Sequence, residues 1–319
     1  MEKEEEKEDR EVEEEDGGWS VQVLGGGEEN SATTSPALFL SSTVAKFGVK
    51  HAAYTVVRLD GHGEPTAVAW HLERLLYSCK RIWEGWRSWD VEAQTLEQTN
   101  TKRMLDVLLH VLAKTSRVPN VMRTVVVVVK DRKVWVAAAE HATPSSLVEK
   151  RGEELAATVT VAAGPPGSGP RPCPNVKDAS WVADRERLDA LKKAEQLTEV
   201  ILVDENNRLL EGLVTNFFVL YKGELWTAPN DAVLKGLMRR TLLLWCKKFQ
   251  INVRFECPRV EDCLHWEAAL LTSAARPCSF VDVFKFRSSP DAPWETVQVP
   301  SRASSVATDL RDAMWEQWG

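Results

Sequence analysis

The stretch between residues 199 and 227 constrains the fold of this 319-residue chain more than any other segment. Three apolar runs follow one another there, and two short turns rich in Asp, Asn, Gly and Lys separate them. Consecutive strands that are joined by such short turns pair antiparallel. We therefore predict a β-meander with strands at residues 199–203, 208–220 and 225–227. Gly212 lies inside the middle run and predicts a β-bulge in one long strand.

Helical and strand patterns alternate on both sides of this meander. Leu72, Leu75, Leu76 and Cys79 recur at the 3.6-residue period of an amphipathic helix. Two valine-rich runs flank a charged turn at residues 130–133 and predict a β-hairpin. Further helices are expected at about residues 104–112, 181–193, 237–249 and 304–315, and further strands at residues 53–59, 268–273 and 278–285. This mixture predicts an α/β (α+β) fold.

The length of the chain predicts two domains. Residues 141–150 are polar and lack periodicity, so we place an interdomain linker there. The smaller N-terminal α/β domain then covers residues 37–140, and a larger, pseudo-barrel C-terminal domain covers residues 151–319. Residues 1–36 are expected to be an acidic disordered tail, because residues 1–16 contain eleven acidic and only three basic side chains.

The composition argues against several classes of protein. The chain is 44% hydrophobic and 27% charged, which is typical of soluble globular proteins. Its net charge of -7 arises in the acidic tail and gives no reason to expect nucleic-acid binding. No apolar run approaches the length that spans a bilayer. The six cysteines and six histidines have no metal-ligand spacing, so we expect reduced core cysteines, no metal site and a cytoplasmic protein.

Three short motifs carry a resemblance to a known family. The first is Trp70-His71-Leu72-Glu73-Arg74-Leu75, the second surrounds Lys177, and the third begins at Glu211-Gly212 and runs to residue 240. Their order and spacing, with the meander between Lys177 and the helix near residue 237, are more specific than any motif alone. The chain resembles the fold-type IV, or class IV, pyridoxal-phosphate aminotransferases over about residues 45–285, and plant and algal D-amino-acid aminotransferase-like members look most similar.

The resemblance implies roles for the ionisable residues of these motifs. Lys177 would hold the aldehyde of pyridoxal 5′-phosphate as a Schiff base and then carry a proton between substrate and cofactor. Glu211 would pair with the pyridine nitrogen and keep the ring protonated, so that the ring accepts electrons. Thr215 would lie beside the cofactor. Asn216 is either a site residue or a structural hydrogen-bonding residue.

The cofactor phosphate would be bound by two elements. Leu237 and Met238 begin a predicted helix, and free N–H groups at such a start bind anions. Arg74 resembles the family's phosphate-binding arginine, because a guanidinium pairs with phosphate in bidentate fashion. The alternative for Arg74 is a solvated arginine, since it lies opposite the apolar face of its predicted helix.

A second phosphate loop of the family matches Ser273 and Ala274. Family members commonly have threonine at the position of Met238 and serine or threonine at that of Ala274, so two hydroxyl donors are missing here. The resemblance also implies substrate contacts from Tyr54 and Ala275, although a tyrosine in the core of a strand is an equal alternative for Tyr54. An arginine for a substrate carboxylate is not evident near residues 125–130.

The resemblance thus implies a homodimeric aminotransferase that converts an amino acid into a keto acid, with the cofactor between the two domains. A lyase that acts on an aminodeoxychorismate-like substrate shares the first steps and stays an alternative. A catalytically idle relative that acts as a binding or interaction protein is the third interpretation. Met238 and Ala274 favour this third interpretation, whereas the retention of Lys177 and Glu211 opposes it.

Overall fold

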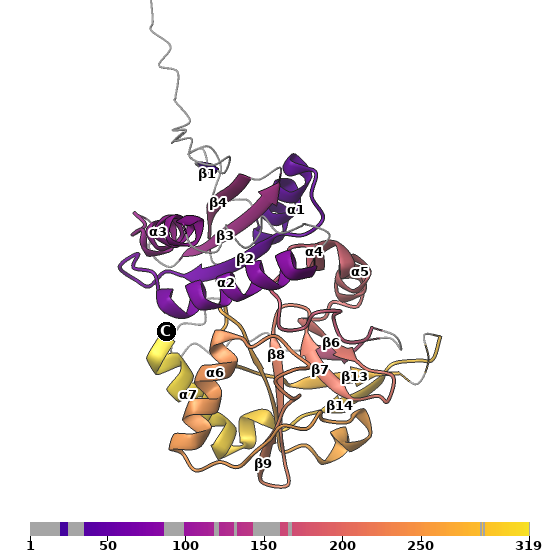
Figure 1. Cartoon of the computed structure of the whole chain (residues 1–319). Coiled ribbons are helices and arrows are strands. Elements are labelled where there is room, and N and C mark those ends of the chain that lie inside the picture. The colour runs from indigo at the N-terminus through magenta and orange to yellow at the C-terminus, as the bar shows by residue number, and fades with distance from the viewer. Residues whose placement is uncertain are drawn as a thin grey trace, which may run out of the picture. The chain divides into compact units, whose positions relative to one another are not determined.

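The computed structural model describes residues 20–24, 35–85, 99–117, 121–130, 133–142, 160–164, 168–287, 289 and 291–318. The chain divides into two compact units, whose helices and strands are labelled in Figure 1. The first unit comprises Met1–Thr143 and Val176–Ala183, and the second comprises Pro144–Asn175 and Asp184–Gly319. The short segment that carries Lys177 therefore groups with the first unit, although its neighbours in sequence on both sides belong to the second.

A four-stranded sheet forms the centre of the first unit. Its strands lie in the order β1 (Ser20–Leu24), β4 (Lys133–Ala142), β3 (Val121–Lys130) and β2 (Ala53–Arg58). β3 and β4 form the predicted hairpin, in which Lys130 pairs with Lys133. β1 pairs parallel with β4, because the outer edge of β4 offers unpaired backbone groups. The expectation that all of residues 1–36 form a tail is therefore wrong for β1, while residues 1–19 and 25–34 lie outside the described part.

Helices cover both faces of this sheet (Figure 1). They are α1 (Pro36–Phe47), α2 (Val68–Gly85) and α3 (Thr99–Ala113). Val125 and Val127 of β3 pack in a cluster with α2 and α3, whereas Val126 and Val128 pack in a second cluster with α1. This division follows from the alternation of side chains along a strand. The valine-rich run is buried on both faces for this reason, and the predicted amphipathic helix is α2.

The second unit is built on a curled ten-stranded sheet. Its main path is β10 (Val253–Arg254), β9 (Glu224–Trp226), β8 (Asn216–Tyr221), β7 (Leu209–Gly212), β6 (Glu199–Val203), β5 (Thr160–Ala163), β13 (Val283–Phe286) and β14 (Glu295–Gln298). β11 (Ala268–Thr272) pairs with β8 and with β12 (Ser279–Phe280). Aromatic side chains of this sheet and its loops, including Phe217, Trp266 and Phe284, form the centre of the core. The predicted meander is thus part of a half-barrel.

Helices of the second unit include α5 (Glu186–Ala194), α6 (Leu237–Lys248) and α7 (Ser305–Trp318), preceded by α4 (Ser180–Asp184) where the chain passes between units. Two 3₁₀ helices are η3 (Val260–His265) and η4 (Ser301–Ala303). α6 and α7 pack side by side (Figure 1), and the indole N–H of Trp245 donates to Gln317 across their contact (2.9 Å). α6 begins at the residue that the sequence predicts and ends one residue earlier.

Three predicted elements are divided in the structure. The long strand at residues 208–220 is wrong: β7 ends at Gly212 and β8 begins at Asn216, because the Gly212 N–H donates to the Thr215 carbonyl (2.9 Å) and closes a turn. A register irregularity lies nearby, in the pairing of β6 with β7. Residues 278–285 divide into β12 and β13, and the helix at 181–193 divides at Arg185, whose guanidinium donates to the Leu213 carbonyl (3.2 Å).

The cysteines agree with a reduced protein core. Cys79, Cys246, Cys263 and Cys278 are buried free thiols, Cys257 is partly buried, and Cys173 is exposed. Burial raises the pKa of both the Cys79 and Cys246 thiols to about 12, which makes them poor nucleophiles. Within the described ranges, no helix is long and apolar enough to cross a membrane.

Candidate active site

Lys177 lies on a short extended segment that adds to the edge of the first sheet. The Tyr54 N–H donates to the Lys177 carbonyl (3.1 Å), and the Lys177 N–H donates to Oγ of Ser78 on α2 (3.1 Å). The following residue, Asp178, accepts hydrogen bonds from the N–H groups of Ala52 and Ser180 (3.2 and 3.1 Å). A strand and a helix therefore both fix the backbone from which the Lys177 amine extends.

Tyr54 lies next to this amine. The Lys177 Nζ is 4.8 Å from the centroid of the Tyr54 ring, within the range of a cation–π contact. Only 6% of Tyr54 is exposed, and the side chain belongs to the apolar cluster under α1. The two interpretations of Tyr54 are therefore compatible, because one face of a core tyrosine also borders the lysine.

The Arg74 guanidinium points towards the sheet and not into solvent. Its Nη2 donates to Oγ1 of Thr55 (2.7 Å), and its central carbon lies 4.2 Å from the ring centroid of Trp70. The Nε atom is buried and has no hydrogen-bond partner among the described residues. Burial lowers the pKa of Arg74 to about 9, because no described carboxylate pairs with its charge. Arg74 is thus not the solvated arginine of the alternative interpretation.

His71 completes this cluster. Its Nδ1 lies 2.8 Å from Oγ1 of Thr55. Because that oxygen accepts from Arg74, we assign the Thr55 proton to the bond with Nδ1, which requires a neutral histidine. Burial lowers the pKa of His71 well below 6.5, and the positive charges of Arg74 and Lys177 act in the same direction. Neither His71 nor Thr55 was predicted as a site residue from the sequence. The available signal for His71 was its spacing of three residues from Arg74, which makes the two neighbours on a helix.

Glu211, in the second unit, is a buried carboxylate with donors on both oxygens. Its Oε1 accepts from both Nε and Nη2 of Arg171 (3.0 and 2.8 Å). Its Oε2 accepts from Nδ2 of Asn216 (3.3 Å) and from the Leu234 N–H (3.0 Å). Both side chains of the ion pair are nearly inaccessible, at 8% for Arg171 and 6% for Glu211. Arg171 was not predicted from the sequence, because a Pro/Gly-rich loop carries it and no periodicity distinguishes it.

Asn216 connects Glu211 to the loop before α6. Its Nδ2 also donates to the Leu234 carbonyl (2.9 Å). A Cβ atom at Gly236 would lie only 2.3 Å from Oδ1 of Asn216, so the glycine leaves room for this amide. Asn216 is therefore at once a structural hydrogen-bonding residue and a direct contact of the acid.

Two of the predicted phosphate elements, the start of α6 and the loop after β11, lie beside Asn216. Gly236 is the N-cap of α6 and supplies no side-chain cap, so the first N–H groups, at Leu237 and Met238, have no side-chain acceptor from it. Thr272 pairs with Asn216 between β11 and β8.

Directly after Thr272 the chain turns back at Ser273, Ala274 and Ala275. The turn is closed by the Ser273 N–H, which donates to the Arg276 carbonyl (2.8 Å), and by the Arg276 N–H, which donates to Oγ of Ser273 (3.1 Å). Ser273 Oγ is thus already an acceptor within the turn, while its own proton is available for donation.

Arg239 is a further buried cation near this site that the sequence analysis missed. Only 1% of it is exposed, and Nη2 donates to the Ala228 carbonyl (2.7 Å), whereas Nε and Nη1 have no partner among the described residues. Burial lowers the pKa of Arg239 to about 10, and the negative charge of Glu211 opposes this shift. Arg171 and Arg239 therefore both place positive charge around Glu211.

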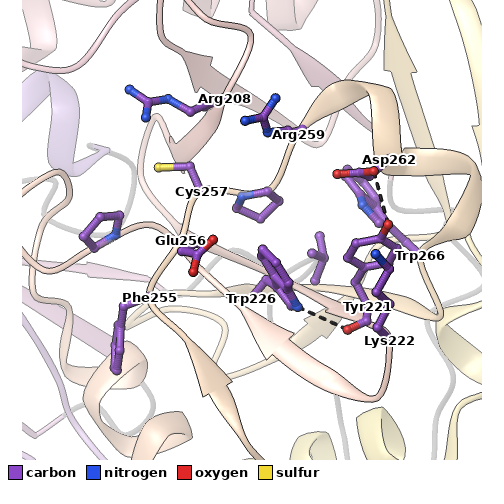
Figure 2. A pocket seen from close by; sticks show the side chains of 13 residues that line it. Arg208, Tyr221, Lys222, Trp226, Phe255, Glu256, Cys257, Arg259, Asp262 and Trp266 are labelled. Atoms are coloured by element: carbon purple, nitrogen blue, oxygen red, sulfur yellow. Dashed lines mark hydrogen bonds between the residues drawn. The ribbon is translucent and has the colours of Figure 1, made fainter.

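A separate pocket of about 390 Å³ lies at the β9 end of the second unit (Figure 2). Tyr221, Trp226 and Trp266 are among the side chains that line it. Its arginines are paired with acidic neighbours: Arg208 with Asp204 (2.7 Å) and Arg259 with Glu261 (2.9 Å). None of the predicted site residues lines this pocket, so it is distinct from the candidate active site.

Comparison with known proteins agrees with this fold. Residues 52–283 match the family model described as amino-transferase class IV, and the chain belongs to this family. A search of curated protein sequences finds no match.

Solved structures share the fold at low sequence identity. A branched-chain aminotransferase from Thermoproteus uzoniensis is 16% identical, with a TM-score of 0.62 over 92% of this chain and 91% of that one. A protein from Legionella pneumophila, assigned as a 4-amino-4-deoxychorismate lyase, is 12% identical, with a TM-score of 0.63 over 94% and 99%. A hypothetical aminotransferase from Mycobacterium tuberculosis in its PLP-bound form is 16% identical, with a TM-score of 0.57 over 83% and 88%.

Proposed function

We propose that this class IV aminotransferase uses pyridoxal 5′-phosphate to convert an amino acid into a keto acid, with Lys177 as the catalytic residue. The observation that carries the proposal is the fixation of the Lys177 backbone by Tyr54 and Ser78 in a chain of this family. A lysine that must meet the same atom in every turnover needs such a rigid origin. A solvated lysine at a helix start has no use for it.

The residues present fit this cofactor. The buried Nε of Arg74, which has no partner among the described residues, suits a phosphate oxygen, and so do the uncapped N–H groups of Leu237 and Met238. Ser273 and Ala274 supply further donors, although Ala274 offers only its backbone. Since each neutral hydrogen bond contributes about 0.5–1.5 kcal/mol, the absent hydroxyls at two positions weaken the phosphate site without abolishing it.

When bound, pyridoxal phosphate supplies an aldehyde carbon that condenses with amines and a ring that accepts an electron pair. The chain supplies the rest of the chemistry. Lys177 would hold the cofactor through its amine and would move the proton of the substrate Cα. Glu211 would bind the ring nitrogen, with Arg171 and Asn216 orienting its carboxylate. Tyr54 would shield the lysine, and Ala275 and the backbone of Thr215 would border the site, since the Thr215 hydroxyl donates to Glu199.

The test is covalent trapping. Purified protein is incubated with pyridoxal phosphate and reduced with borohydride, and the modified peptide is located by mass spectrometry. We expect the adduct on Lys177 in the wild type and no adduct in Lys177→Ala. Lys222→Ala is the matched control, because the Lys222 amine also lies 4.8 Å from a tyrosine ring, that of Tyr221. An unmodified Lys177 in the wild type would overturn the proposal and favour the idle binding protein.

A lyase is the second candidate, since one solved structure of this fold is assigned as a 4-amino-4-deoxychorismate lyase. Both reactions begin with removal of the same proton. Keto-acid formation from a panel of D- and L-amino acids supports the aminotransferase, whereas release of pyruvate from aminodeoxychorismate supports the lyase. The panel also tests the proposed D-amino-acid aminotransferase-like subtype.

We further propose a cytoplasmic homodimer whose partners are small molecules, an amino acid and a keto acid. The measurement is the molar mass by light scattering, with and without pyridoxal phosphate. A monomer at micromolar concentration in both samples would argue against the dimer.

A further inference from the structure

The hairpin between β7 and β8 presents different groups on its two faces. Glu211 and Asn216 pair across the hairpin, and their side chains form one hydrogen bond on the face towards Arg171 and Leu234. The four residues between them form a closed turn, because the Gly212 N–H donates to the Thr215 carbonyl. Any force that moves this turn therefore moves the acid.

A second buried carboxylate, Glu199 of β6, accepts hydrogen bonds from the turn at residues 212–215 on its opposite face. Its Oε2 accepts from Oγ1 of Thr215 (3.0 Å) and from the Val214 N–H (3.3 Å). Its Oε1 accepts from the Val200 N–H (3.1 Å), and the Lys192 amine lies 3.9 Å away. Only 1% of Glu199 is exposed. A carboxylate is costly to bury, so its retention here calls for a role.

The absence of a side chain at Gly212 allows Glu199 and Thr215 to pack against the turn. A Cβ atom at this position would lie 2.2 Å from Oγ1 of Thr215 and 2.7 Å from Cγ of Glu199. Since neighbouring side chains of a strand point to opposite faces, this is the face away from Glu211. The glycine therefore leaves space for the bond between Thr215 and Glu199, and the Thr215 hydroxyl is directed away from the face that carries Glu211.

We infer that Glu199 is a positioning residue that sets the carboxylate of Glu211 by holding the turn at residues 212–215. Glu199 does so mainly through the hydrogen bond that it accepts from the Thr215 hydroxyl. The inference rests on the proposed function, in which Glu211 binds the cofactor ring. Arg185 assists, because its guanidinium holds the Leu213 carbonyl in the same turn.

The experiment is a double-mutant cycle of Glu199→Gln and Thr215→Val. The glutamine keeps the shape of the side chain but turns an NH₂ group towards donors. We measure the dissociation constant of pyridoxal phosphate and the pH midpoint of the absorbance of the bound cofactor. Each single variant is expected to weaken binding about tenfold and to shift the midpoint, and the double variant to be no worse than Glu199→Gln.

Thr227→Val is the matched control. Thr227 is also a buried threonine of the second unit, and its hydroxyl donates to the Phe217 carbonyl (2.9 Å) and not to a carboxylate. It is expected to lower the urea midpoint of the cofactor-free protein while leaving the dissociation constant and the pH midpoint of absorbance unchanged. If Glu199→Gln behaves like this control, or if the two changes are additive, the inference is overturned.

The same cycle separates the inference from the proposed function. Absence of a trapped adduct on Lys177 in the wild type would reject the function, and the urea midpoints of the cofactor-free variants then decide about Glu199. If the shift in the double variant is smaller than the sum of the two single shifts, Glu199 holds the turn through Thr215. If the two shifts add, the inference is refuted.

Discussion

Arg74 and Glu211, the charged residues proposed to bind opposite ends of one cofactor, have contrasting surroundings. Arg74 donates to a neutral hydroxyl, stacks on Trp70 and keeps a buried Nε without a partner in the described chain. Glu211 has donors on both oxygens, including an arginine. Arg74 therefore lacks a counter-ion and a hydrogen-bond acceptor that a bound anion would supply. Glu211 is already oriented by donors of the protein itself.

The largest expected effect comes from breaking the complete pair. Arg171→Met leaves the Glu211 carboxylate buried without its cation, which costs about 3–5 kcal/mol of unfolding free energy. Urea unfolding of the cofactor-free protein measures it. Arg259→Met is the matched control, because its ion pair with Glu261 is exposed on both sides (57% and 70%) and contributes about 0–1 kcal/mol. Equal losses in the two variants would show that the pair of Arg171 and Glu211 is not special.

Filling the deficit at Arg74 should stabilise the protein. Inorganic phosphate at one hundred times its dissociation constant is expected to add about 2.7 kcal/mol to the cofactor-free wild type. Arg74→Met should abolish this gain, and Arg81→Met, an exposed arginine on the same helix, should retain it. The measurement is the thermal midpoint with phosphate against chloride at equal ionic strength. A gain that survives Arg74→Met would place the anion elsewhere.

The hydrogen bonds around Arg74 should depend on pH through His71. Its folded pKa lies well below 6.5, so below pH 6.5 the unfolded chain binds more protons than the folded one. The contribution of His71 to the unfolding free energy is therefore fully present above pH 6.5. It is lost on acidification, by at most about 1.4 kcal/mol per pH unit.

The check is urea unfolding at pH 7.5 and pH 5.5. His71→Gln should reduce the loss on acidification relative to the wild type, whereas His62→Gln, at an exposed turn position, should not. An identical loss in all three proteins would contradict the assignment of a neutral His71.

The smallest effect is expected for Arg74→Met, and it gives the clearest comparison with Arg171→Met. In phosphate-free buffer, Arg74→Met should change the unfolding free energy by less than about 1 kcal/mol, or raise it, because the variant removes a buried charge without a counter-ion. Arg171→Met acts in the opposite direction for the reason given above. A loss at Arg74 as large as that at Arg171 would mean that Thr55 and Trp70 already compensate the charge of Arg74.

Local patterns predicted most elements, and failures occurred where long-range contacts decided the outcome. α2, the β3–β4 hairpin and α6 follow from periodicity and turn residues, which are local properties. The break between β7 and β8 does not, because the turn at residues 212–215 is held by Glu199 of another strand in addition to its own backbone hydrogen bond. β1 depends on the free edge of β4, which the sequence does not display.

The candidate site shows the same division between residues in local motifs and residues brought in by long-range contacts. Lys177, Glu211 and Arg74 were predicted from motifs, whereas Arg171 and His71 were not.

By itself the sequence determined the class of fold and the family and supplied the residues proposed for the chemistry, because these depend on patterns and motifs within short segments. The tertiary structure decided which side chains serve those residues: Arg171 for Glu211, Thr55 for Arg74, and Glu199 for the turn beside Glu211. Partners 15 to 40 residues apart meet only after the chain has folded, since hydrogen bonds require contact in space and leave no periodic trace in the sequence.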